Sequence, residues 1–192
     1  MKKIIVLTLW LLVGVFVAAQ AQQTSSSSSK EERKAQREAE KARIKAEEER
    51  AYAIAVQAIN NKQFVLEVDQ IGFKRGRNAF VTSNTNFVML NDKRASVQIA
   101  FNTPNPGPNG IGGITVDGNT NELKVTTDKR GNVNCSFSVQ GTGISAQVFI
   151  TLTHGGNKAS ARVSPNFNSN TLELRGTLIP LEESNVFKGR SF

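Results

Sequence analysis

Hydrophobic and polar residues alternate most regularly from Gly143 to Ser164. Apolar side chains occupy every second position from Ile144 to Leu152, and polar or small ones fill the positions between them, with Phe149 as the exception. The sequence His-Gly-Gly-Asn at residues 154–157 suits a tight turn, and alternation resumes over residues 158–163. This stretch predicts a β-hairpin with one dry face, which says more about architecture than about chemistry.

Shorter alternating segments lie on both sides of this hairpin and are separated by turns rich in Asn, Gly and Pro. They cover residues 64–73, 80–90, 95–101, 114–116, 123–125, 133–139 and 172–178. The parity of the apolar positions changes before Ile71, which predicts a bulge or bend near Asp69 and Gln70. Gly118 and Asn119 are expected to end one strand.

About nine short strands with no helical segment between them predict a mainly β domain over residues 62–192. We expect an antiparallel up-and-down meander. Since almost every strand has one apolar face, the sheet must close into a barrel-like domain or fold into a sandwich, and we prefer the barrel.

Residues 30–61 are rich in Glu, Lys, Arg, Gln and Ala, contain no Gly or Pro, and predict one long N-terminal α-helix. Up to Arg50 the charges are mixed in sign, which favours a solvated spacer over a coiled-coil or partner-binding arm. From Ala51 onward the apolar residues follow helical spacing, so the last turns should dock on an end or edge of the β domain.

The first 21 residues have the pattern of a signal peptide. Lys2 and Lys3 precede an apolar run, and Ala19-Gln20-Ala21 forms a small-residue cleavage pattern. We expect cleavage after Ala21, a flexible Ser-rich linker over residues 22–29, and a mature chain that is periplasmic or secreted with no membrane span.

Charge and cysteine content limit the possible partners and crosslinks. The full chain has a formal net charge of +8, and removing Lys2 and Lys3 leaves 22 basic against 16 acidic residues. This charge is spread along the chain without a basic helix carrying interleaved aromatics, so no nucleic-acid partner is expected. Because Cys135 is the single cysteine, no intrachain disulfide can form.

Few residues could carry chemistry. His154 is the single histidine, at a strand end, and we interpret it as a structural residue with one ring nitrogen bonded locally. Cys135 has core parity and should be an inert buried thiol. No metal site, cofactor or catalytic residue is expected. The glycine-rich stretch at residues 107–113 lacks the Gly-Lys-Ser/Thr ending of a phosphate loop and is interpreted as a structural rim loop.

Two sets of charged residues remain as candidates. Lys74, Arg75 and Arg77 form a basic turn that could bind an anion, with Lys188 and Arg190 as further members, although solvated surface charge is the preferred interpretation. The strand carboxylates could supply an acid and base pair, but their parity puts most of them on the wet face. They are Glu67, Asp69, Asp117, Glu122 and Glu173.

Several stretches of the chain resemble one known family. They are Phe80-Val-Thr-Ser-Asn-Thr-Asn-Phe87, Gly107-Pro-Asn-Gly-Ile-Gly-Gly-Ile-Thr-Val116, Gly143-Ile-Ser-Ala-Gln-Val148, Ser164-Pro-Asn-Phe-Asn-Ser-Asn170 and Glu183-Ser-Asn-Val-Phe-Lys-Gly-Arg-Ser191. In these stretches the chain is similar to domain-of-unknown-function family 4251. The members of this family are secreted proteins of Bacteroidetes with a signal peptide, a variable linker or helix and an all-β domain. The resemblance spans roughly Ala51 to the C-terminus and implies a Gram-negative envelope, but no established activity.

Together these observations favour a non-enzymatic binding module of the periplasm or cell exterior that uses a barrel mouth or loop rim for a small ligand or an envelope protein. One alternative is a carboxylate-dependent hydrolase acting on glycans. The other is a structural or assembly protein of the cell envelope, whose charged helix contacts a partner.

Overall fold

The structure is a computed structural model that describes residues 2–73, 76–101, 107–142, 144–166 and 171–191, with side chains described from residue 30 onward, apart from that of Glu122. One helix, α1 (Lys2–Asn60), precedes all the strands. The chain divides into two compact units, Met1–Ala46 and Glu47–Phe192.

Within the first unit, every side chain described in residues 30–46 is exposed. Glu40 and Arg43 form an i,i+3 ion pair at 2.9 Å, one of the pairs that the charge pattern predicts. This part of α1 is therefore solvated, as predicted. The structure also continues α1 through residues 2–29, whereas signal cleavage and a flexible linker concern the mature chain and stay predictions.

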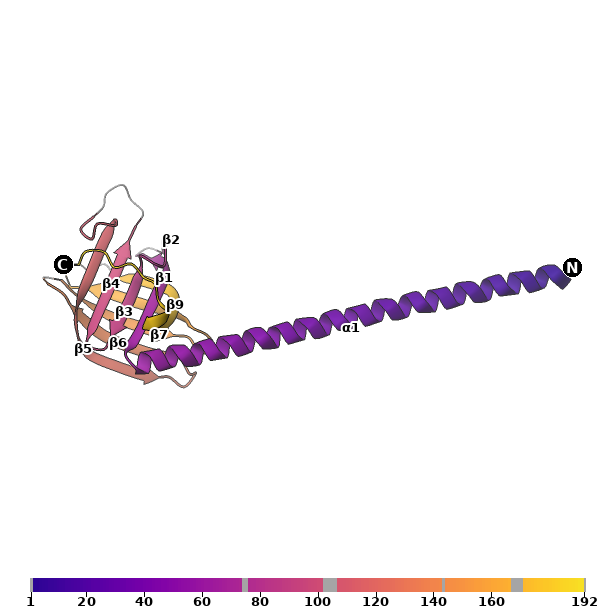
Figure 1. The fold of residues 1–192 in the computed structure, drawn as a ribbon, viewed down its shortest axis with the longest axis horizontal. Helices are drawn as coiled ribbons and strands as arrows, with labels where there is room; N and C mark the ends of the chain where they lie inside the picture. Colours follow the sequence, from indigo (N-terminus) through magenta and orange to yellow (C-terminus); the bar gives the residue numbers. More distant parts are fainter. Residues whose placement is uncertain (1, 74–75, 102–106, 143, 167–170, 192) are drawn as a thin grey trace. The chain divides into compact units, whose positions relative to one another are not determined.

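The second unit is a closed antiparallel barrel (Figure 1). Its strands are β1 (Gln63–Gly72), β2 (Asn78–Phe80), β3 (Phe87–Asn91), β4 (Arg94–Ala100), β5 (Gly113–Thr127), β6 (Val133–Gln140), β7 (Ser145–Leu152), β8 (Lys158–Pro165) and β9 (Leu172–Pro180). They pair in the order β2-β1-β3-β4-β5-β6-β7-β8-β9, and β9 also pairs with β1. The short strand β2 pairs with the end of β1, and the other strands form the barrel wall, so the predicted barrel is confirmed.

The barrel interior is filled by the apolar side chains that the alternation predicts to face inward. Among the largest fully buried side chains inside it are Phe64, Leu66, Phe137, Ile150 and Leu178. An eight-stranded barrel is just wide enough for side chains to fill it. The inside of the barrel is therefore a core, and any ligand has to bind on its surface.

The last turns of α1 close one end of this barrel. Ala55, Ala58 and Ile59 are buried and belong to the same hydrophobic cluster as the strands. The Tyr52 hydroxyl donates to the carbonyl oxygen of Gly131 in the β5–β6 turn. Docking of the apolar stripe on an end of the β domain is thus as predicted.

Two irregularities shape the wall. The register between β1 and β9 shifts between Val68 and Gln70, which confirms the predicted bulge. The prediction that Gly118 and Asn119 end a strand is wrong, because β5 runs through both residues. A Cβ at Gly118 would lie 1.7 Å from the carbonyl oxygen of Gln140. This glycine therefore permits a close approach of two strands instead of terminating one.

The central hairpin has the predicted alternation. Strands β7 and β8 pair from Ala146 opposite Pro165 to Leu152 opposite Ala159. The inward positions of β7 are buried, and Phe149 points outward with 49% of its surface exposed. Phe149 is therefore an exposed aromatic ring on a face of β7 whose other side chains are polar.

The outer face of β3, β4 and β5 differs from the prediction of a wet face. Outward side chains such as Phe87, Ser96 and Gln98 are buried there. After β9 and the 3-10 helix η1 (Leu181–Glu183), residues 184–191 cross this face, and we call them the C-terminal strap. The strap explains why β4 is buried on both sides.

Candidate functional site

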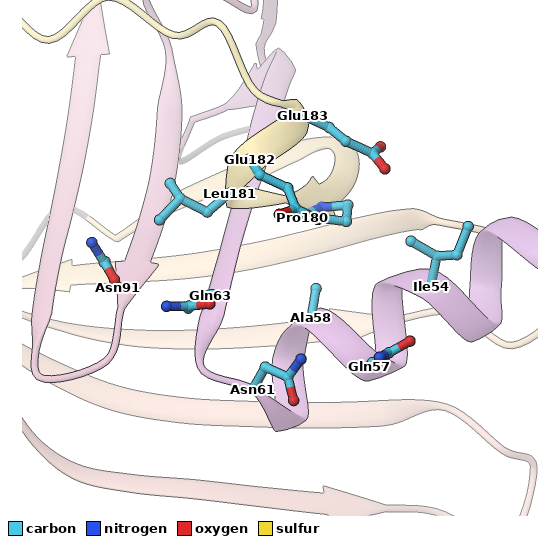
Figure 2. A pocket seen from close by; sticks show the side chains of 10 residues that line it. All are labelled: Ile54, Gln57, Ala58, Asn61, Gln63, Asn91, Pro180, Leu181, Glu182 and Glu183. Atoms are coloured by element: carbon cyan, nitrogen blue, oxygen red, sulfur yellow. The ribbon is translucent and has the colours of Figure 1, made fainter.

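A polar groove of about 550 Å³ lies between the docked end of α1 and the segment formed by the end of β9 and η1 (Figure 2). Its lining residues come from α1, the starts and ends of the neighbouring strands, and η1. They are Ile54, Gln57, Ala58, Asn61, Gln63, Asn91, Pro180, Leu181, Glu182 and Glu183. We call this set of residues the polar groove.

The polar groove is the space left between α1 and the segment formed by the end of β9 and η1 at one end of the barrel. Ala58 offers a small buried side chain on α1, and Pro180 ends β9 and turns the chain into η1. Figure 2 shows Glu183 directed outward from η1, with Ala58, Asn61 and Gln57 on the helix below it. A larger residue than alanine at position 58 would narrow the space between them.

The polar side chains of the groove share one property. The carboxamides of Gln57, Asn61, Gln63 and Asn91, and the carboxylates of Glu182 and Glu183, form no hydrogen bond or ion pair within the described part of the chain. Carboxamides both donate and accept, whereas carboxylates accept and carry negative charge. The groove is therefore a mildly acidic, hydrogen-bonding surface on a chain that is basic overall.

Most of the basic turn of the predicted anion patch lies outside the described residues. Lys74 and Arg75 lie outside the residues that the structure describes, and Arg77 is exposed in the turn before β2. Lys188 instead donates to Asp117 at 3.1 Å. The backbone N–H of Arg190 donates to the carbonyl oxygen of Asn109 at 3.1 Å, so both strap residues serve the attachment of the strap.

Asp117 is the most strongly engaged of the candidate carboxylates. It accepts hydrogen bonds from Ser96 at 2.5 Å, Lys188 at 3.1 Å and Arg94 at 3.2 Å. Burial raises the pKa of Asp117, but the hydrogen bonds from Ser96 and Lys188 and the two nearby positive charges outweigh it, so the pKa is lowered. Asp117 is thus a fixed anion that anchors the strap.

The other candidate carboxylates with described side chains each have a partner of their own. Glu67 accepts from the Ser184 hydroxyl at 2.7 Å, which ties the start of the strap to β1. Asp69 lies 4.0 Å from Lys158, and Glu173 lies 3.4 Å from Arg162. Glu122 lies in β5, but its side chain is outside the described part. The described carboxylates are engaged with cations or hydroxyls, an arrangement that does not favour an acid and base pair.

Cys135 is buried as its parity predicts, whereas the interactions of His154 with the described residues are a ring contact and a backbone hydrogen bond, not the predicted local bond of a ring nitrogen. Cys135 is fully buried in the barrel, and desolvation raises the pKa of its thiol to about 12. His154 lies in the β7–β8 turn with its ring packed edge-on against Tyr52, at 4.9 Å between ring centroids. Its backbone N–H donates to the side chain of Asn132 at 3.0 Å. His154 therefore helps to seat α1.

The described part of the glycine-rich loop, residues 107–113, is organised around Asn109. This side chain is 1% exposed, and its oxygen accepts from the backbone N–H groups of Ile111 at 3.1 Å and Gly113 at 2.9 Å. The amide donor of Asn109 reaches the Ile99 carbonyl oxygen at 3.4 Å. These bonds support the interpretation as a structural loop, since they use the loop's own donors internally.

Gln98, under the strap, did not emerge from the sequence patterns as important. Its side-chain nitrogen donates to the carbonyl oxygens of Thr85 at 2.9 Å and Phe187 at 2.7 Å. Its oxygen accepts from the Thr115 hydroxyl and the Gly189 N–H, both at 2.8 Å. The signal in the sequence that bears on the strap is the stretch of residues 183–191, which resembles the family.

Two further observations concern the described residues alone. No helix in that part of the chain is long and apolar enough to cross a membrane. No group of three or more His, Cys, Asp and Glu side chains there is placed to hold a metal ion.

Comparisons with known proteins place the chain in a family. The model of a family described as a domain of unknown function (DUF4251) matches residues 46–178. A crystal structure of a DUF4251 family protein from Bacteroides eggerthii DSM 20697 at 1.95 Å resolution is 59% identical, covers 77% of this chain and 99% of that chain, and has a TM-score of 0.66. A search of curated proteins found no match. This chain therefore belongs to the DUF4251 family.

Proposed function

We propose that the chain is a non-enzymatic binding module that acts in the periplasm or outside the cell, and that the polar groove is its binding site. The observation that supports this most is the set of side chains in the groove that have no partner within the described chain. Hydrogen-bonding groups gathered around one concavity are what a recognition site needs.

The chemistry of the groove selects among ligands. Glu182 and Glu183 favour a positively charged group, and the carboxamides on the opposite wall favour a ligand that donates and accepts hydrogen bonds. A lysine- or arginine-bearing segment of an envelope protein meets both requirements, and so does a small ligand with an ammonium group. The volume of about 550 Å³ falls within the size of small-molecule sites, roughly 300–1,000 Å³.

A titration of residues 22–192 with a tri-lysine peptide, followed by backbone amide NMR, tests this function. We expect shifts confined to residues 54–63, Asn91 and residues 180–183. The double variant Glu182→Gln, Glu183→Gln should weaken binding about fivefold, since exposed charge pairs contribute about 0.2–1 kcal/mol each.

The double variant Glu31→Gln, Glu32→Gln is the matched control, because it also removes two carboxylates, from the exposed part of α1. It should leave the affinity unchanged. A tri-glutamate peptide should not bind. Shifts scattered over every exposed acidic residue, or equal weakening by the control, would refute a site in the groove.

A further inference from the structure

A second concavity lies on the outer face of the barrel, away from the polar groove. It has a volume of about 310 Å³ and is lined by residues of β5, β6, β7 and β8 and by Asn166 just after β8. Cross-strand pairs place its members side by side, with Gln147 opposite Ser138 on one neighbour and Ser164 on the other. It is therefore a surface formed by the sheet itself.

Among the residues whose side chains are described, none that lines the concavity is charged. Apart from Ala146, its lining consists of carboxamides and hydroxyls. The side chains of Asn121, Gln140 and Gln147 make no hydrogen bond within the described chain. Asn166 uses its oxygen to accept from the Ser145 N–H at 3.0 Å, and its amide donors make no hydrogen bond to the described residues. An ionic ligand would lose hydration here without gaining a counter-charge, whereas a neutral polyhydroxylated ligand matches these groups.

The exposed ring of Phe149 borders this polar surface. Phe149 lies two residues after Gln147 on β7, so both side chains point to the same face, about 7 Å apart. Arg162 lies opposite Phe149 on β8 and forms an ion pair with Glu173 at 3.4 Å. This ion pair limits the net charge beside the Phe149 ring. A large apolar ring held out of the core offers a flat surface for the C–H face of a sugar.

We propose that this face binds a neutral oligosaccharide, with one pyranose ring stacked on Phe149 and the hydroxyl groups of the neighbouring sugar units bonded to Gln147, Gln140 and Asn166. The volume of about 310 Å³ suits one or two sugar units, because it lies at the small end of ligand sites. A shallow, exposed site of this kind gives affinities near the millimolar range for a short oligosaccharide. The saccharide face does not depend on the polar groove, since the two share no residue.

The test is a titration of residues 22–192 with maltohexaose, xylohexaose and chitohexaose, read by amide NMR. We expect at least one to shift the backbone amides of residues 145–149 and the side-chain amides of Gln140 and Gln147, while residues 180–183 stay unshifted. Hexagalacturonate, which is acidic, should not shift them.

Variants separate stacking from general surface effects. Phe149→Ala should weaken saccharide binding at least tenfold, and Phe149→Tyr should retain it because the ring remains. Phe80→Ala is the matched control, since Phe80 is 86% exposed in β2. It should leave binding unchanged. Gln147→Ala tests the polar contacts without altering the ring, and it should also reduce the affinity.

The proposal is overturned if none of the three neutral oligosaccharides shifts this face at about 10 mM. It is also overturned if Phe149→Ala and Phe80→Ala weaken binding equally, or if hexagalacturonate shifts the same amides as strongly. Shifts in residues 145–149 that depend on protein concentration alone would instead identify the face as a contact between two copies of the chain.

Discussion

Replacing Gln98 by alanine should loosen the C-terminal strap and destabilise the barrel. The Gln98 side chain is fully buried and takes part in four hydrogen bonds, two of them with strap residues Phe187 and Gly189. A typical net contribution is about 1 kcal/mol for each hydrogen bond. Gln98→Ala removes all four bonds, so the loss is about 4 kcal/mol at this value and about 2 kcal/mol at the lower value of about 0.5 kcal/mol per bond.

Two measurements on residues 22–192 check this reasoning. Urea denaturation should give a loss of about 2–4 kcal/mol in the free energy of unfolding for Gln98→Ala. Hydrogen exchange of the Phe187, Gly189 and Arg190 amides should be protected in the unsubstituted chain and faster in the variant, because these N–H groups donate within the barrel.

The matched control is Gln140→Ala, which removes an exposed carboxamide with no partner in the described chain. It should change stability by less than about 0.5 kcal/mol. The reasoning is refuted if Gln98→Ala costs less than about 1 kcal/mol and leaves the protection of the strap amides unchanged. In that case Gln98 would be a buried side chain that water can replace at little cost.

Three further predictions follow from the barrel wall. Because the pKa of Asp117 is lowered on folding, its contribution to stability is present at neutral pH and is lost as the pH falls below the ordinary value of 3.8. Urea denaturation from about pH 6 to about pH 3 should therefore show a smaller loss of unfolding free energy in Asp117→Asn than in the unsubstituted chain. Cys135, with its pKa raised to about 12, should not react with a thiol reagent at about pH 8 until denaturant is added, and rapid labelling of the native chain would contradict its burial. Gly118→Ala should cost more than about 3 kcal/mol in thermal or urea unfolding, whereas Gly156→Ala, with open space around it, should cost less than about 1 kcal/mol; similar losses would disprove the close approach to Gln140.

Much of the fold could be predicted because the burial of a strand face, a bulge or a helix stripe is determined by the order of apolar and polar residues within that element. The alternation from Ile144 to Leu152 fixes which face of β7 is buried, and the parity change before Ile71 results directly from the bulge between Val68 and Gln70. The docking of α1 follows from the apolar stripe after Ala51 in the same way. Each of these features is decided within a few residues.

Features that depend on distant partners were harder to predict. From the sequence alone Gly118 is interpreted as the end of a strand, because glycine often occurs there. Its role inside β5, where it makes room for the backbone of Gln140, depends on a residue far away in the sequence. Gln98 and Ser96 read as wet-face residues because nothing local announces that residues 184–191 will cover them. The polar groove is assembled from three separate segments of the chain, residues 54–63, Asn91 and residues 180–183, so no spacing in the sequence could reveal it.

The seam between β1 and β9 also has a kinetic consequence. Phe64 pairs with Pro180, so the two strands that close the ring come from opposite ends of the domain's sequence. Contacts so far apart form late, because the entropy of closing a long loop must be overcome before they contribute any energy. The ring cannot close until nearly all of the domain is available. A chain that crosses a membrane in extended form would thus stay unfolded during transit and complete its barrel on the far side.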